Sequence, residues 1–219
     1  MLAAASLTDV FQALADELAN EFPDLEITFS FGPSSGLVEQ VLAGAPADLL
    51  ATADSATMDK AISGGAVEGD PVVFAHNTLI LAVPAGNPGG ITSLADLARE
   101  ELRIALCEPQ VPCGAATERL LDIAGVTAEP DTLEGDVRDT TGKVALGEVD
   151  AALIYRTDAA AMADEIDTID VPEAGGVVNE YPVAVLSGVA NRPGADAFVQ
   201  ALTGELGRQV LDEAGFVRP

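Results

Sequence analysis

The feature that most constrains this chain is the repeated alternation of short apolar runs with amphipathic helical stretches. An apolar stub at 2–5 precedes TDVFQALADELANEF, in which apolar residues recur at helical spacing: Val10, Leu14, Leu18 and Phe22. The residues from Leu25 to Phe31 then alternate as in a strand, followed by a short helix at VEQVLAG, a buried strand at ADLLATA and a helix at SATMDKAISGG. Such βα units predict an α/β fold with largely parallel sheets.

A long β-rich run at 72–87, VVFAHNTLILAVPAGN, can carry the chain out of the first set of βα units. A second set follows, with helices predicted at SLADLARE, GAATERLLDIAG and 136–147 and strands at LRIALCE, DAALIY and IDTIDVP. The similar run VVNEYPVAVLSGV provides a return path to closing helices. The order predicts two α/β lobes joined by two crossover strands, with a ligand cleft between them. The predicted lobes are 1–80 with 182–219, and 81–181.

Composition excludes several classes of function. The chain has 219 residues and a formal net charge of -26, from 36 acidic and 10 basic residues, which argues against binding to nucleic acid or to an anionic membrane surface. The acidity is interpreted as a solvated surface that keeps a secreted or salt-adapted protein soluble. No apolar run reaches the roughly 18 residues of a membrane span. MLAAASLTDV lacks the features of a secretory signal, so we expect any export segment to be absent from this sequence.

Two cysteines, Cys107 and Cys113, occur close together in LCEPQVPCG. They are too few for a zinc site, since His76 is the only histidine. Three readings stay open: a local disulfide, two free thiols, or a catalytic or metal-binding role. A disulfide would imply an oxidising, extracytoplasmic compartment.

Small or hydroxyl residues stand at several predicted helix starts. They lie in AAASLTD at Ser6, in GPSSG at Ser34 and Ser35, in PCGAATE at Cys113 and in GDVRDTTGK before Val137. The first N–H groups of a helix have no internal partner and carry partial positive charge, so they can hold an anion without a basic side chain. Several such helix starts facing one cleft would form an oxyanion site of neutral donors.

Each of these residues also has an ordinary structural reading. A serine before a helix often serves as its N-cap, and Ser6 with Asp9 fits a capping box. Tyr155, which ends the apolar strand DAALIY, could present its hydroxyl to the cleft or be a buried tyrosine bonded to backbone.

Taken in order along nearly the whole chain, these motifs resemble the molybdate-binding proteins of bacterial ABC importers, which have the type II periplasmic-binding-protein fold. The resemblance is carried by AAASL, the F-G-x-S-S turn, GAPADLLATAD, NTLILAVP, VPCG, DVR, DAALIYRTDA and EYPVAV. It implies a periplasmic or otherwise extracytoplasmic receptor, free or lipid-anchored through a missing N-terminal segment. The receptor would bind molybdate or tungstate as an oxyanion, with no directly coordinated metal cation and no cofactor, and deliver it to a membrane permease.

In that family two serine hydroxyls, two backbone N–H groups and a tyrosine hydroxyl hold the oxyanion. The resemblance assigns these roles, in that order, to Ser6, Ser34, Cys113, Val137 and Tyr155, with Ser35 as a possible addition. The family often has alanine at the position of Cys113, and a bond from Cys113 to Cys107 would stiffen this loop.

We further expect a monomer that catalyses no reaction, and the net charge of -26 argues against a nucleic-acid partner. Three alternatives remain: a receptor for a sulfate-type oxyanion, the effector-binding domain of a regulator, and an enzyme that uses Cys113 or His76. Nothing in the sequence gives His76 a catalytic partner at a recognisable spacing.

Overall fold

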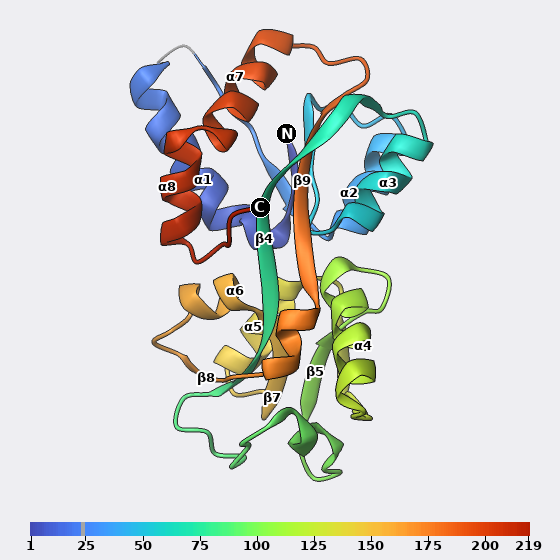
Figure 1. Ribbon diagram of the computed structural model, residues 1–219, viewed down its shortest axis with the longest axis vertical. Coiled ribbons are helices and arrows are strands. Elements are labelled where there is room, and N and C mark those ends of the chain that lie inside the picture. Colours follow the sequence, from blue (N-terminus) through green and yellow to red (C-terminus); the bar gives the residue numbers. More distant parts are fainter. Residues whose placement is uncertain (23–24) are drawn as a thin grey trace. The chain divides into compact units, whose positions relative to one another are not determined.

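The computed structural model describes residues 1–22 and 25–219 and divides the chain into two compact units (Figure 1). Unit 1 comprises Met1–His76 and Glu180–Pro219, and unit 2 comprises Asn77–Asn179. The chain changes unit within two long strands, β4 (Val67–Pro84) and β9 (Val178–Leu186). The predicted lobe boundaries, at 80 and 181, fall in the same two strands.

Unit 1 is a small sheet flanked by helices. Its strands follow the order β2-β1-β3-β9, in which β1 is parallel to β2 and β3 while β9 is antiparallel to β3. Besides parts of β4 and β9, its elements are β1 (Leu2–Ala4), η1 (Ala5–Leu7), α1 (Thr8–Glu21), β2 (Ser30–Gly32), α2 (Ser34–Leu42), β3 (Leu49–Ala51), α3 (Ser55–Ser63), α7 (Arg192–Thr203) and α8 (Glu205–Glu213).

The predicted apolar stripe of α1 forms much of the core of unit 1. Val10, Leu14 and Leu18 are buried, and the ring of Phe11 packs edge-on against Phe198 of α7 at a centroid distance of 5.3 Å. Phe22 was predicted to continue the stripe, which is wrong: its side chain is 47% exposed. The helix ends at Glu21, and Phe22 already has non-helical backbone angles, so its side chain leaves the buried face.

Strand β2 is shorter than the predicted strand from Leu25 to Phe31, since it spans only Ser30–Gly32. Its ladder partner β1 has three residues, which pair with Ser30, Phe31 and Gly32. Alternation of side chains does not create a strand where no neighbouring backbone completes the ladder.

Unit 2 contains a sheet in the order β6-β5-β7-β4, with β8 also paired to β4. Strand β5 is parallel to β6 and β7, whereas β4 is antiparallel to β7 and β8. Its elements are η2 (Leu94–Ala98), β5 (Ile104–Cys107), α4 (Pro112–Ala124), β6 (Thr132–Glu134), α5 (Val137–Ala145), β7 (Ala151–Tyr155), α6 (Arg156–Ala161), β8 (Ile166–Ile169) and η3 (Pro172–Gly176).

The predicted α/β class is confirmed, with several differences in detail. The sheets are mixed, because the long strands β4 and β9 pair antiparallel with their neighbours in each unit. The predicted helix at SLADLARE is the 3-10 helix η2, whose start is fixed by a capping box between Ser93 and Asp96.

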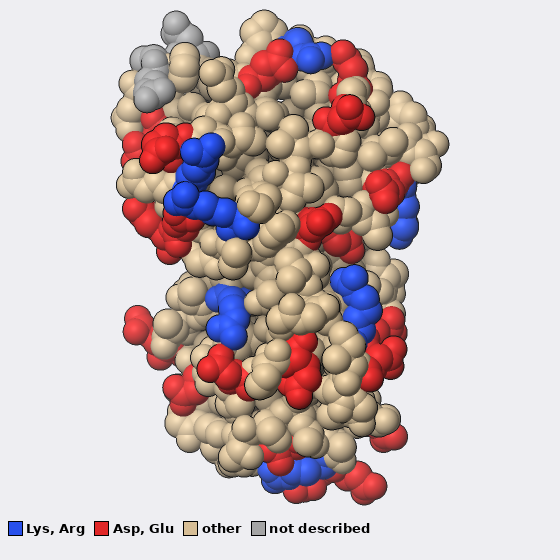
Figure 2. All heavy atoms as spheres, in the orientation of Figure 1, with Lys and Arg blue, Asp and Glu red and all other residues tan. Residues whose placement is uncertain are grey.

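Acidic side chains are spread over the visible face of both units, and basic ones are few (Figure 2). Several arginines bind neighbouring carboxylates; Arg192, for example, contacts Glu68 and Asp196 at 2.7 and 2.8 Å. Within the described residues, no helix combines the length and apolar character needed to cross a membrane.

Candidate functional site

The predicted donors of unit 1 follow neighbouring parallel strands. Ala4, the last residue of β1, pairs with Gly32, the last residue of β2. Ser6 and Ser34 each stand two residues further along. Because the carboxyl ends of parallel strands share one edge of a sheet, the fold brings Ser6 and Ser34 to the same edge.

Ser34 is the first residue of α2 and is 1% exposed. Its hydroxyl oxygen accepts a hydrogen bond from the backbone N–H of Ala53, with 3.0 Å between Oγ and N. In the described part of the chain this is the only hydrogen bond of the Ser34 side chain, so the hydroxyl proton remains for an acceptor outside it. Ser35, the alternative donor, is half-buried in the next position of the helix.

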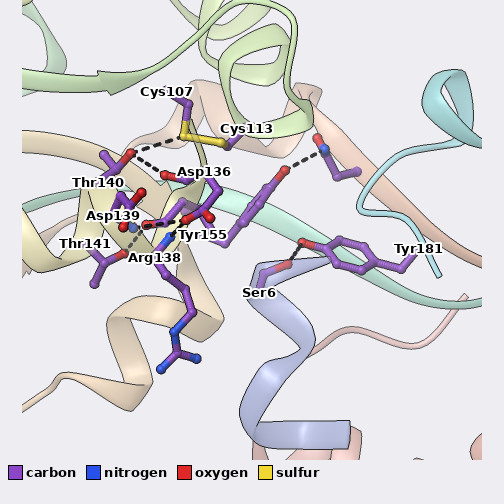
Figure 3. The surroundings of a disulfide bond; sticks show 12 residues. Ser6, Cys107, Cys113, Asp136, Arg138, Asp139, Thr140, Thr141, Tyr155 and Tyr181 are labelled. Carbon is purple, nitrogen blue, oxygen red and sulfur yellow. Dashed lines mark hydrogen bonds between the residues drawn. A yellow bond between two sulfur atoms is a disulfide. The ribbon is translucent and has the colours of Figure 1, made fainter. Parts of the chain in front are cut away.

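Ser6 lies in η1, directly after β1, and its Oγ is 3.1 Å from the hydroxyl oxygen of Tyr181 (Figure 3). Either oxygen can be the donor. Tyr181 is fully buried in β9, where its ring packs edge-on against Phe74 and Phe216, so it gives Ser6 a rigid partner. Helix α1 begins at Thr8 with Leu7 as its N-cap, so Ser6 does not cap this helix.

The predicted donors of unit 2 also collect at one sheet edge. Cys113 follows β5, Val137 follows β6, and Tyr155 is the last residue of β7. Both β6 and β7 are parallel to β5, so all three donors belong to the carboxyl edge of this sheet.

The start of α4 is bonded covalently to the end of β5. Cys107, the last residue of β5, forms a disulfide with Cys113, the second residue of α4, across a Cα–Cα distance of 5.8 Å. Gly114 permits this close approach, because a Cβ there would lie 1.9 Å from the carbonyl oxygen of Glu108. Among the described residues no side chain caps α4, so the N–H of Cys113 belongs to the unpaired first turn of the helix.

Helix α5 has a different start. The carboxylate of Asp136 accepts hydrogen bonds from the N–H groups of Arg138 and Asp139, at 2.8 and 3.0 Å. These bonds use the second and third amides of the helix and do not involve the first, that of Val137. The negative charge of Asp136 is the main cause of a raised pKa at Asp139, with burial and Glu134 adding to it. Any anion at the Val137 amide therefore has to overcome repulsion from Asp136.

The disulfide also contacts α5. The Sγ of Cys107 is 3.3 Å from the hydroxyl of Thr140, which in turn donates to the carbonyl oxygen of Asp136 at 2.9 Å (Figure 3). Cys107 thus belongs to β5, is bonded to the first turn of α4 and contacts the first turn of α5.

Tyr155 is 1% exposed at the end of β7. Its hydroxyl oxygen accepts a hydrogen bond from the side-chain amide of Asn179, with 2.9 Å between Nδ2 and the oxygen. The phenolic proton takes no part in this bond. The alternative reading, a tyrosine held by backbone, therefore does not describe this contact.

Two partners of the candidate ligands, Asn179 and Tyr181, were not identified from the sequence. Both lie in the run VVNEYPVAV, which predicted only a strand. A signal was present, because Asn179 and Tyr181 stand at alternate positions of the strand, on either side of the exposed Glu180, and therefore share one face. A polar side chain on a buried face needs a hydrogen-bond partner.

The same geometry bears on metal binding and covalent catalysis. Within the described residues no group of three or more His, Cys, Asp or Glu could hold a metal ion. Both sulfur atoms are in the disulfide, so Cys113 offers no thiolate nucleophile in this state. The backbone of His76 pairs with that of Val217. Neutral hydroxyl and amide donors are thus the chemistry that the candidate residues offer.

Comparison with known proteins gives a consistent result. The family model described as bacterial extracellular solute-binding protein matches residues 1–217. The molybdate-binding protein ModA of Mycobacterium tuberculosis is 40% identical over 219 residues, which cover 100% of this chain and 84% of that protein.

Solved structures show the same fold. The periplasmic molybdate-binding protein of Azotobacter vinelandii superposes with a TM-score of 0.82 at 21% identity, covering 100% of this chain and 98% of that one. The sulfate-binding protein SubI of Mycobacterium tuberculosis superposes with a TM-score of 0.86 at 19% identity, covering 98% and 84%. Binding proteins for two different oxyanions thus share this fold, so the fold alone does not identify the ligand. The chain belongs to the family of bacterial extracellular solute-binding proteins.

Proposed function

We propose that this protein captures molybdate or tungstate outside the cytoplasm and delivers it to the membrane permease of an ABC importer. The observation that carries the proposal is the Ser34 hydroxyl: among the described residues, its side chain makes one hydrogen bond, which its oxygen accepts from the Ala53 amide, so its proton can be donated to a ligand. A buried hydroxyl held in this way is suited to an acceptor-only ligand. A fully deprotonated tetrahedral oxyanion is such a ligand.

The remaining donors have the same character. Besides Ser34, the proposed ligands are the hydroxyls of Ser6 and Tyr155 and the N–H groups of Cys113 and Val137. We propose that one dianion takes donors from both units, so that its binding favours the arrangement in which both reach it. A ligand that contacted a single unit would have no such effect.

The affinity does not require a positive charge. A hydrogen bond to a charged oxygen contributes about 1.5–3 kcal/mol net, so a handful of them reaches the range of tight binding. The net charge of -26 opposes the binding of a dianion only weakly, because exposed charges further than about 8 Å from the ion are largely screened at physiological salt.

Sulfate is the alternative ligand, since it has the same charge and shape and differs mainly in size. Molybdate is favoured because the full-length sequence likeness is to a molybdate-binding protein at 40% identity. Hydrogen phosphate is disfavoured by the chemistry of the site, because its own proton needs an acceptor. We propose no preference between molybdate and tungstate, which are nearly equal in size.

Further parts of the proposal concern partners and location. We propose a monomer that binds no nucleic acid and catalyses no reaction. The disulfide supports an oxidising compartment such as the periplasm, and so does the solute-binding family. A lipid anchor ahead of Met1 stays a prediction.

Isothermal titration calorimetry tests the proposal. The purified protein is titrated with molybdate, tungstate, sulfate and hydrogen phosphate in turn, at fixed ionic strength. We expect one site per chain, tight binding of molybdate and tungstate, weaker binding of sulfate and the weakest binding of hydrogen phosphate. Equal affinity for sulfate and molybdate would overturn the molybdate assignment, and no heat with any of the four ions would overturn the receptor itself.

A further inference from the structure

The two residues at which unit 2 begins and ends are both buried asparagines. Asn77 is its first residue and Asn179 its last, and each is 2% exposed. Asn179 donates its side-chain amide to the hydroxyl of Tyr155 at 2.9 Å, and Asn77 donates its side-chain amide to the hydroxyl of Thr157 at 2.8 Å. In each of the two strands in which the chain changes unit, an asparagine therefore donates a hydrogen bond to a hydroxyl at the junction of β7 and α6. In both bonds the hydroxyl oxygen is the acceptor.

The direction of the hydrogen bond between Asn179 and Tyr155 determines which groups of the phenol remain for a ligand. A tyrosine hydroxyl can donate one proton and can also accept. An asparagine Nδ2 can only donate, so this bond uses the accepting capacity of the phenol and not its proton. Burial strengthens the constraint, since a buried polar group that loses its partner incurs the full cost of desolvation.

We propose that Asn179 is a specificity-determining positioning residue. It holds the Tyr155 hydroxyl as a donor, so that this hydroxyl serves a fully deprotonated oxyanion and rejects a singly protonated one such as hydrogen phosphate. The inference rests on the proposed function, because it requires that Tyr155 contacts the ion. Asn179 itself acts through Tyr155.

The substitution Asn179→Asp reverses the polarity with little change in shape. A carboxylate can only accept, so it takes the phenolic proton and turns a lone pair of the phenol toward the ligand. We expect the affinity for molybdate to fall by about 100-fold. The hydrogen bond from the phenol to a charged oxygen is lost, and repulsion between the phenol's lone pair and that oxygen replaces it. The new negative charge repels both dianions alike, so the diagnostic quantity is the ratio of the affinities for molybdate and hydrogen phosphate. We expect this ratio to fall by about tenfold or more.

Asn77→Asp is the matched control. It introduces the same charge at the other crossover and reverses a bond of the same kind, but to Thr157, which has no proposed contact with the ion. We expect the ratio for this variant to stay within about threefold of the wild-type ratio. An equal fall of the affinity ratio in both variants would overturn the inference. The cause would then be the added charge, or a general destabilisation of the two strands, and not the bond to Tyr155.

A double-mutant cycle gives a second test that adds no charge. Asn179→Leu removes the donor, and it is made in the wild-type background and in the Tyr155→Phe background. If Asn179 acts through the phenol, Asn179→Leu weakens molybdate binding by about tenfold in the wild type and by less than about twofold beside Tyr155→Phe. Equal effects in the two backgrounds would overturn the inference.

The outcomes for the inference and for the proposed function are distinct. A wild-type protein that binds no tetrahedral oxyanion overturns the proposed function and the inference together. A wild-type protein that binds molybdate, with additive effects at Asn179 and Tyr155, overturns only the inference. Thermal melting of each variant shows whether the protein used for the titration is folded.

Discussion

The hydroxyl oxygen of Ser34 lies 3.0 Å from the backbone nitrogen of Ala53, which connects the start of α2 to the segment that follows β3. Because β1 pairs with both β2 and β3, this bond lies at the edge where Ser6 also stands. It fixes the Ser34 side chain by its oxygen and does not use the hydroxyl proton, which we propose is donated to the ligand. A serine that merely capped its own helix would use this oxygen on an amide of α2 instead.

Substitution of this serine therefore has two effects that can be separated. We expect Ser34→Ala to weaken molybdate binding by about tenfold or more, because one hydrogen bond to a charged oxygen is lost. The same change removes the hydroxyl oxygen that accepts the hydrogen bond from the Ala53 amide, which we expect to cost about 1–3 kcal/mol of stability. Calorimetry measures the first effect and chemical denaturation the second.

Ser35→Ala is the control, since it makes the same change one residue further along α2. We expect it to alter molybdate affinity by less than about threefold. Stronger binding loss in Ser35→Ala than in Ser34→Ala would show that the neighbouring serine is the ligand.

The disulfide is expected to stabilise unit 2 and to position the first turns of α4 and α5. We expect the double variant Cys107→Ser with Cys113→Ser to lose about 2 kcal/mol of stability, the value of the chain-entropy model for so short a loop. Urea denaturation of the variant, and of the wild type with and without a reductant, measures this loss. A reductant that destabilises the variant as much as the wild type would contradict the assignment of the effect to this bond.

Two glycines in helices of unit 2 give a paired prediction. We expect Gly114→Ala to destabilise the protein by about 1–3 kcal/mol, because its Cβ would meet the carbonyl oxygen of Glu108 at 1.9 Å. Gly142 lies within α5 and has open space where a Cβ would be, so we expect Gly142→Ala to stabilise by about 0.5–1 kcal/mol through helix propensity. Thermal unfolding of both variants checks the opposite signs; two changes of the same sign would contradict the packing assigned to Gly114.

The parts of the fold that depend on local pattern could be predicted from the sequence. The alternation of periodicities identified the βα units, and the two long apolar runs identified the strands in which the chain changes unit. Helix starts after strands also predicted candidate donors at Ser6, Ser34, Cys113 and Val137, because the unpaired amides of a helix start are a property of its sequence position. Tyr155 was predicted from the end of a strand, and the set of five ligands from the family resemblance.

Long-range partners could not be predicted in this way. Tyr181 is 175 residues from Ser6, and Asn179 is 24 residues from Tyr155, so no local pattern relates them. The state of the cysteines stayed open for a related reason. The spacing of Cys107 and Cys113 in the sequence is compatible with a disulfide or with two free thiols. The fold selects the disulfide, because the junction of β5 with α4 places their Cα atoms 5.8 Å apart. The short β2 shows the same limit, since its length is set by β1.

The acidic surface predicts a dependence of stability on salt. With a net charge of -26, repulsion between carboxylates opposes the folded state, and added salt screens it. We expect the melting temperature to rise between about 0.05 and 1 M sodium chloride. Chloride is chosen because sulfate is itself a candidate ligand. A melting temperature that falls with salt would contradict this prediction. It would mean that ion pairs such as Arg103 with Asp150 stabilise the fold by more than the repulsion between carboxylates destabilises it.

The most direct test of the central claim is a crystal structure of the protein with molybdate, in which anomalous scattering at the molybdenum edge locates the ion. We predict one molybdenum position per chain, with the hydroxyls of Ser6, Ser34 and Tyr155 and the amides of Cys113 and Val137 within hydrogen-bond distance of its oxygens. A molybdenum position away from these five groups, or one held by lysine or arginine side chains, would contradict the claim that neutral donors from both units bind the ion.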